Sequence, residues 1–165
     1  MYRKILVTLD GTELSESVIP EVVRLARGTN TAITLLRVAK LPKREPAAEP
    51  AVIAGVGRLN GAGQAREALE TVDQAMERVR LDLESYLEEN AKPLRAEGLS
   101  VQCDVEFADD AAEAIDQHSR HSDADLMVMA THGRTGLARL LFGSVAGRVL
   151  ERGAKPILLV QPGGA

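Results

Sequence analysis

Aromatic side chains are scarce in this sequence: they make up 2% of its 165 residues, and tryptophan is absent. The scarcity argues against a nucleic-acid surface, because such surfaces commonly stack bases on aromatic rings. The formal net charge of -4 argues the same way, since DNA- and RNA-binding proteins carry basic patches. We therefore expect no nucleic-acid partner.

Long apolar runs and cysteines are scarce as well. No stretch contains the roughly 20 consecutive apolar residues that a membrane-spanning helix needs. The N-terminus also lacks the apolar core and small-residue cleavage site of a secretory signal. The lone cysteine, Cys103, excludes an internal disulfide and a cysteine-rich metal site, and it fits a reducing compartment. We expect no membrane association and a cytoplasmic location.

Short apolar segments alternate with segments of helical periodicity along most of the chain. Apolar, β-branched runs predict strands, at 4–9, 32–38, 101–107, 125–130 and 156–160. Apolar residues three or four apart predict helices, at about 15–28, 65–97, 110–120 and 144–152. Strands separated by helices favour an α/β fold, an open five-stranded parallel sheet with helices on both faces. Ser15 or Ser17 is the expected N-cap of the first helix.

One segment interrupts this alternation. Residues 40–64 contain three prolines and four glycines without a steady period, which predicts an irregular loop insert. Long loops in compact domains often cover binding sites, so the insert is a candidate lid. No internal repeat or linker divides the chain, and we predict a single domain over residues 1–165.

Two polar segments follow strands at the carboxyl ends, where sheets of this kind bind ligands. Asp10 follows the first strand, and a glycine-containing loop, 131–143, follows the fourth. That loop leads into a helix whose free N–H groups, with the Ser144 hydroxyl, suit a phosphate. The residues alone leave a second interpretation open, in which the glycines only turn the chain, Ser144 caps the last helix and Asp10 caps the first.

Several standard catalytic and nucleotide motifs are missing. The sequence has no G-x-x-x-x-G-K-[ST] segment, which excludes a Walker-type ATPase. No G-x-G-x-x-G follows the first strand, which excludes an ordinary dinucleotide site. The nucleophile, base and orienting residue that acyl transfer needs are not evident either. We expect slow turnover of a bound nucleotide, or none.

The segment ATHGRTGLARLLFGSVA, residues 130–146, resembles the signature of the universal stress protein family. The matching residues are Gly133 and, after nine intervening residues, Gly143 and Ser144, with Ala130 in place of the first glycine. Four other segments resemble family segments in the same order: MYRKILVTLDGTELSES, LLRV, AEAI and KPILLV. The resemblance implies an adenine nucleotide alpha hydrolase-like, Rossmann-like fold with strand order 3-2-1-4-5.

The resemblance also implies an adenine nucleotide as ligand, ATP or else AMP or ADP, with Mg²⁺ near Asp10 in some members. The implied nucleotide-binding residues are Thr8, Leu9, Asp10, Val38, Met129, Ala130, His132, Gly133, Arg134, Gly143, Ser144 and Val145. By this likeness Asp10 lies near the ribose hydroxyls, Val38 meets the adenine, and the residues from Gly133 onward surround the phosphates. His132 either touches a phosphate or orients the turn.

By this resemblance we expect an ATP-binding universal stress protein that acts as a nucleotide-dependent regulatory module in a stress response. Two alternatives remain open: a nucleotide-free dimeric interaction scaffold of the same fold, and a slow ATPase in which a positioned water attacks the nucleotide. The apolar last strand, 156–160, is expected at a sheet edge, and the resemblance implies a homodimer through it.

The remaining candidates for chemistry are two histidines and the cysteine. His118 and His121 lie three residues apart on a predicted helix, but no third ligand is evident, so we expect solvated surface histidines rather than a zinc site. Cys103 is expected to be a small core residue, because no cationic neighbour in the sequence would lower its pKa.

Overall fold

The computed structural model describes residues 2–40, 72–131, 143–153 and 155–161. Within these ranges the elements follow one another as β1 (Lys4–Thr8), α1 (Glu13–Glu16), α2 (Ile19–Ala26), β2 (Ala32–Ala39), α3 (Val72–Ala96), β3 (Ser100–Phe107), α4 (Ala111–His121), β4 (Leu126–Ala130), α5 (Ser144–Arg152) and β5 (Ile157–Val160).

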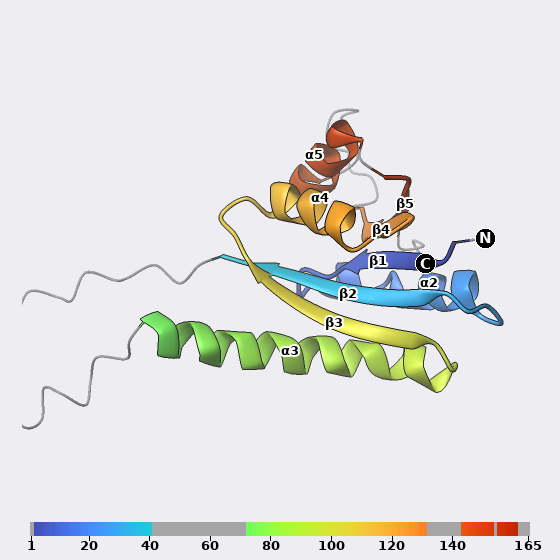
Figure 1. The fold of residues 1–165 in the computed structure, drawn as a ribbon, viewed down its shortest axis with the longest axis horizontal. Coiled ribbons are helices and arrows are strands. Elements are labelled where there is room, and N and C mark those ends of the chain that lie inside the picture. The colour runs from blue at the N-terminus through green and yellow to red at the C-terminus, as the bar shows by residue number, and fades with distance from the viewer. Residues whose placement is uncertain (1, 41–71, 132–142, 154, 162–165) are drawn as a thin grey trace, which may run out of the picture.

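The strands form one parallel sheet in the order β3-β2-β1-β4-β5, with β1 at its centre (Figure 1). β1 pairs on one side with β2, where Ile5 faces Ile33, and on the other with β4, where Ile5 faces Leu126. The predicted α/β class and strand order are confirmed. Because every strand runs the same way, the carboxyl ends of β1, β2 and β4 meet at one edge of the sheet.

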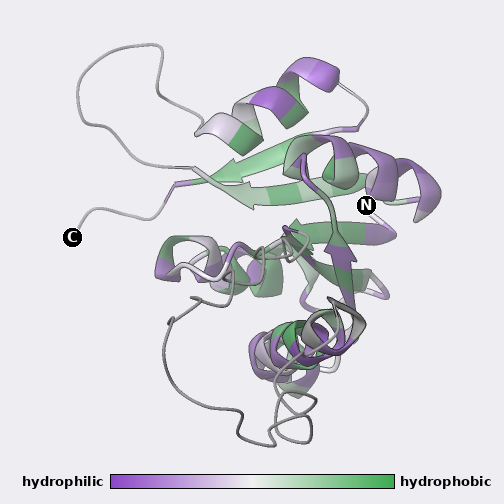
Figure 2. Cartoon of the chain, turned by 90° about the vertical axis from the view of Figure 1, so that its left-hand side faces the viewer, coloured by the Kyte–Doolittle hydropathy of each residue, from purple (hydrophilic) through white to green (hydrophobic). Residues whose placement is uncertain are grey.

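Helices cover both faces of the sheet. Side chains alternate along β1, so Ile5 and Val7 pack with α2 and α3, whereas Leu6 packs with α4 and α5. Figure 1 shows this division, with α3 on one side of the sheet and α4 and α5 on the other. In Figure 2 the strands are mainly hydrophobic in colour and the helices carry hydrophilic residues along their lengths, which is the pattern of a covered parallel sheet.

The segment after β1 differs from the prediction. Thr12 is the N-cap of α1, and its side chain accepts a hydrogen bond from the Ser15 N–H. α2 begins separately at Ile19, and no side chain caps it. The expectation that Ser15 or Ser17 caps a single helix is therefore wrong. The Ser15 and Ser17 hydroxyls instead donate to the carbonyls of Thr12 and Leu14, which draws both serines into the short first turn.

α3 is the longest described helix, and Pro93 lies inside its last turns. Gly98, with a φ of 79°, lies in the short turn between α3 and β3. Apart from Lys40, the insert at 40–64 lies outside the described residues, so its role as a lid stays a prediction. None of the helices in the described ranges, α3 included, combines the length and the apolar character needed to cross a membrane.

Cys103 lies on β3, partly buried against the core cluster that includes Leu35 and Leu87. Burial, followed by the nearby Glu88 carboxylate, raises the pKa of its thiol to about 11. The thiol therefore stays protonated near neutral pH and serves as a small packing group, which is the role expected of it.

Buried strand residues form a large part of the hydrophobic core, and Leu35 is one that is fully buried, with 0% exposure. We expect Leu35→Ala to lower the free energy of unfolding by about 2–5 kcal/mol, because it removes buried methyl groups and leaves a cavity. Urea unfolding followed by circular dichroism measures the loss.

The matched control is Leu81→Ala on α3, since 56% of the Leu81 side chain is exposed. This variant should change stability by no more than about 0.5 kcal/mol. Equal losses in the two variants would contradict the assignment of the core.

Candidate functional site

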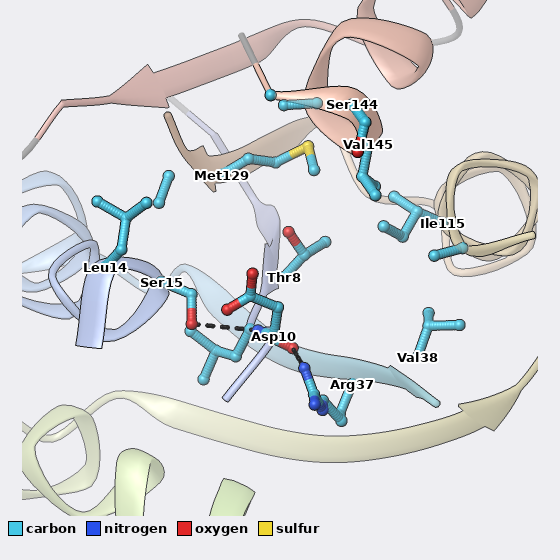
Figure 3. Close-up of a pocket in the computed structure, with 15 residues that line it drawn as sticks. Thr8, Asp10, Leu14, Ser15, Arg37, Val38, Ile115, Met129, Ser144 and Val145 are labelled. Atoms are coloured by element: carbon cyan, nitrogen blue, oxygen red, sulfur yellow. Dashed lines mark hydrogen bonds between the residues drawn. The ribbon is translucent and has the colours of Figure 1, made fainter. Parts of the chain in front are cut away.

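A pocket of about 160 Å³ opens at the carboxyl edge of the sheet, over the ends of β1, β2 and β4 (Figure 3). The first turns of α4 and α5 close it on one side, and α1 closes it on another. This is the place where the chain leaves β1 in one direction and later returns beside it as β4. Parallel sheets bind ligands at such switch points.

The predicted site residues that the structure describes all line this pocket: Thr8, Leu9, Asp10, Val38, Met129, Ala130, Gly143, Ser144 and Val145. His132, Gly133 and Arg134 lie outside the described residues. Six further residues line the pocket that were not predicted from the sequence: Leu14, Ser15, Arg37, Ala111, Ile115 and Ala146. Most of these come from helix ends, whose approach to the sheet has no local sequence signal.

Apolar side chains form much of the pocket wall. Met129 and Ile115 are buried, with exposures of 4% each, and they extend the core cluster between the sheet and α4 and α5. Val38 and Val145 are partly buried against the same cluster. Figure 3 shows these four side chains on one side of the pocket, with Asp10 across from them. A wall of this kind suits a flat apolar ring.

The Asp10 carboxylate is held by the turn that follows β1. Its Oδ1 accepts hydrogen bonds from the N–H of Thr12 (3.0 Å) and from the Thr12 hydroxyl (2.5 Å). The Asp10 N–H in turn donates to the Ser15 hydroxyl oxygen (3.1 Å). Asp10 is therefore not the N-cap of the first helix, which was one of the two roles left open by the sequence. Thr12 is the N-cap, and Asp10 orients it through these hydrogen bonds.

The charge of Asp10 is stabilised within this turn. Burial tends to raise the pKa of its carboxyl, but hydrogen bonds from Thr12 and Ser15 and the positive charge of Arg37 outweigh burial and hold that pKa below its ordinary value. Asp10 is therefore an ionised acceptor at neutral pH, able to receive hydrogen bonds from hydroxyl groups.

The first turn of α5 borders the pocket, and no side-chain hydrogen bond caps it among the described residues. Gly143 is the N-cap, with φ 67° and ψ 158°, and no side chain caps the helix there. Among the described residues, Gly147 is the first at this end whose N–H donates to a carbonyl, that of Gly143 at 3.0 Å. Ser144 is the first helical residue, so the alternative in which it caps the helix is wrong. The preceding N–H groups suit an anion.

An ion pair ties together the two helices that flank the pocket. Asp110 caps α4, accepting from the N–H groups of Ala112 and Glu113, and its other oxygen accepts a hydrogen bond from Arg148 of α5. The Arg148 guanidinium, followed by the capping N–H groups, keeps the pKa of Asp110 below its ordinary value. The pair fixes the spacing between Ala111 and the first turn of α5, both of which line the pocket.

The two histidines of α4 lie away from the pocket and differ from each other. His118 is largely buried, with 12% of its side chain exposed; its Nδ1 lies 2.5 Å from Glu106 and its Nε2 3.4 Å from Asp104. His121 is exposed and donates from Nδ1 to the Gln117 carbonyl. The expectation of a solvated histidine is therefore wrong for His118, because alternate residues of β3 point toward α4. Across the described ranges, no three metal-binding side chains are arranged to hold an ion.

Comparison with known proteins agrees with the observed sheet. Residues 1–161 match the model of the universal stress protein family. The chain belongs to the universal stress protein family. Its resemblance to that family, inferred above from the sequence, is thereby confirmed.

Individual relatives in this family align over nearly their whole lengths. Universal stress protein MJ0577 of Methanocaldococcus jannaschii is 26% identical over 164 residues, which is 98% of this chain and 96% of that protein. A solved structure of MJ0577 superposes with a TM-score of 0.71 at 21% identity, covering 100% of this chain and 99% of the other. At this identity the superposition shows the shared fold.

Two further solved structures of the family are described as nucleotide complexes. One is a universal stress protein in complex with cAMP, with a TM-score of 0.62 at 18% identity and 96% of each chain covered. The other is an Arabidopsis thaliana family member, At3g01520, with AMP bound; its TM-score is 0.58 at 13% identity, covering 98% of this chain and 93% of that one.

The hydrogen bonds around Asp10 predict the effect of changing Thr12. We expect Thr12→Ala to raise the pKa of the Asp10 carboxyl, because the variant removes the hydroxyl that donates to Oδ1. The loss of the N-cap should also cost about 1 kcal/mol of stability. A carbon-13 NMR titration of Asp10 measures the first effect, and urea unfolding measures the second.

The sign of the pH dependence follows from the same contact. Because the folded pKa of Asp10 is lowered, its contribution to stability is present above the unfolded value and is lost as the pH falls through the folded one. In Thr12→Ala, the stability lost as the pH falls into the acid range should be smaller. Thr12→Ser keeps the hydroxyl and should leave the Asp10 titration unchanged; a shift as large as that of Thr12→Ala would contradict the assigned hydrogen bond.

Proposed function

We propose that this pocket binds an adenine nucleotide, ATP or a related adenine nucleotide such as AMP, and that the bound nucleotide regulates the protein within a stress response. The observation that carries the proposal is the arrangement of three kinds of group around one pocket: an apolar wall, an ionised carboxylate and an uncapped helix N-terminus. The apolar wall suits the base, the carboxylate suits the ribose, and the helix N-terminus suits the phosphate chain.

Each part of the nucleotide has a physical reason for its place. The adenine ring lies against Val38, Ile115 and Met129, which offer apolar contact. The ribose hydroxyls donate to Asp10, as carboxylates do in other nucleotide sites at switch points. The phosphates accept hydrogen bonds from the first N–H groups of α5, with the Ser144 hydroxyl beside them. His132, Gly133 and Arg134 complete the phosphate side of the proposal.

The nucleotides named for the two related structures support an adenine ligand for this pocket. A Mg²⁺ ion fits the same arrangement, because Mg²⁺ in nucleotide sites is commonly held by phosphate oxygens and one or two carboxylates. Asp10 supplies the carboxylate among the described residues that line the pocket. It would hold the ion together with the phosphates.

Glycine at the start of α5 provides a direct test. Gly143 has φ 67° and ψ 158°, a conformation that residues with a Cβ adopt only with strain. We expect Gly143→Ala to weaken ATP binding by about tenfold or more, because the first N–H groups of α5 lose their alignment with the phosphates. Isothermal titration calorimetry with Mg²⁺ and millimolar ATP measures the change.

Gly153→Ala is the matched control, since Gly153 also has a positive φ, of 62°, but lies at the other end of α5 with open space where a Cβ would be. It should cost stability and leave the affinity for ATP unchanged. Absence of binding in the unaltered protein, together with no nucleotide in the purified protein by mass spectrometry, would favour a nucleotide-free scaffold. Normal ATP binding by Gly143→Ala would contradict the proposal that the phosphates bind at the N-terminus of α5.

We further propose that the chain forms a homodimer through β5. β5 is an edge strand, and Leu158 on it is 38% exposed. Unpaired edges of this kind tend to be covered by another strand.

The dimer should therefore be sensitive to charge at Leu158. We expect Leu158→Asp to give a monomer at micromolar concentration, because a carboxylate would lose its hydration at the interface. Size-exclusion chromatography with light scattering measures the mass. Leu81→Asp is the control at another exposed leucine and should remain dimeric. A monomeric unaltered protein would contradict the proposal.

A further inference from the structure

Arg37 lines the pocket with Asp10, and these two are the ionisable residues among its described lining. Arg37 lies near the end of β2, directly before Val38. Alternation along the strand places its side chain on the face of α3, opposite to Val38. Its guanidinium therefore reaches the pocket from beneath the turn that follows β1 (Figure 3).

The Arg37 side chain holds the backbone of that turn. Its Nη1 donates to the Leu9 carbonyl at 3.2 Å. The Leu9 N–H donates to the Leu36 carbonyl at 3.0 Å. Both backbone groups of Leu9 are thus fixed by consecutive residues of β2, immediately before the chain reaches Asp10.

The guanidinium also packs against Gly11. A Cβ placed on Gly11 would lie 3.2 Å from Nη2 of Arg37, closer than nine in ten real Cβ contacts, so the guanidinium would have to shift by a few tenths of an ångström. Gly11 has a φ of 83°, so both its conformation and the space beneath it favour glycine. The planar guanidinium therefore supports the turn from Leu9 to Gly11 along its length.

The environment of Arg37 is costly for a residue that only stabilises the fold. Its Nε is buried and has no hydrogen-bond acceptor among the described residues. Buried donors without acceptors lower stability, and such costs tend to occur at functional sites. Arg37 also makes no direct ion pair with Asp10; in Figure 3 the carboxylate and the guanidinium lie on opposite sides of the turn backbone.

We propose that Arg37 is a positioning residue for Asp10: through the Leu9 carbonyl and the surface of Gly11 it fixes the turn so that the Asp10 carboxylate faces the ribose hydroxyls. The proposal rests on the proposed function, since it concerns how the same pocket recognises the sugar. Arg37 acts through the turn and not on the nucleotide itself. Its removal should therefore affect the recognition of ribose and leave the base and phosphates bound.

The test compares ATP with 2′,3′-dideoxy-ATP, which lacks both ribose hydroxyls. Calorimetric titration of the full-length protein should show tighter binding of ATP in the unaltered chain. We expect Arg37→Met to weaken ATP binding about tenfold, the usual scale for a hydrogen bond to a charged group, and to change dideoxy-ATP binding less than about twofold. Combining Arg37→Met with Asp10→Ala should weaken ATP binding no further than Asp10→Ala alone.

Arg80→Met is the matched control. Arg80, on α3, is also partly buried, and it donates to a backbone carbonyl, that of Val105 at 3.3 Å. Its guanidinium lies over the ring of Phe107 on β3, and it is not among the residues that line the pocket. This variant should bind both nucleotides as the unaltered chain does. Loss of the ATP preference in Arg80→Met would show that the readout reports general destabilisation, and would overturn the proposal.

Arg37→Lys is a second variant that keeps the test decisive if Arg37→Met does not fold. Lysine keeps the charge but has no planar group to bond Leu9 and pack under Gly11 together, so the preference for ATP should fall below that of the unaltered chain. A second readout is the pKa of Asp10, which should rise in Arg37→Met because a positive charge is lost.

The outcomes separate the two proposals. If the unaltered chain binds neither nucleotide, the proposed function fails. The second case is that the unaltered chain binds ATP more tightly than dideoxy-ATP, but Arg37→Met weakens the binding of both nucleotides equally or Arg37→Lys keeps the full preference for ATP. Nucleotide binding then stands, and the positioning role of Arg37 is overturned.

Discussion

The parallel pairing of β1 with both β2 and β4 is the constraint on which the site depends. Hydrogen bonding on both sides fixes the register of β1, so its carboxyl end meets those of its neighbours at one edge. Segments far apart in the sequence, the Asp10 turn and the first turn of α5, are thereby brought to one pocket. The buried side chains of β1 on both faces hold this register, because a shift by one residue would exchange the two faces.

The pocket divides its chemistry between side chains and backbone. The apolar wall comes from side chains of β2, β4, α4 and α5, and the carboxylate from Asp10 after β1, whereas the groups proposed to bind the phosphates are N–H groups of α5. Backbone donors lose no side-chain entropy when they bind a ligand and are fixed by the helix itself. Asp10 is less rigid by nature, and a network through Thr12, Ser15 and Arg37 restrains it.

Much of this arrangement could be predicted from the sequence. Alternating strands and helices gave the parallel sheet, and the resemblance around Gly143 and Ser144 gave a set of residues that lie together where they are described. The division of the first helical segment into α1 and α2 could not be predicted, because a serine hydroxyl can donate to any of several nearby carbonyls and the sequence does not determine which one. Arg37 was missed for a related reason: alternation assigns it to the face opposite Val38, and only a long side chain returning under the turn brings it to the pocket. His118 was misjudged since its partners lie on another element.

α5 extends from the pocket toward the edge of the sheet. Its first residue borders the pocket, and its C-cap at Gly153 lies four positions before the start of β5, the edge strand of the described sheet. A helix of nine residues is about 13 Å long and bends little, so its two ends move together. A ligand that contacted the first turn of α5 would therefore act on a rigid element whose other end leads into the strand proposed to carry the subunit contact.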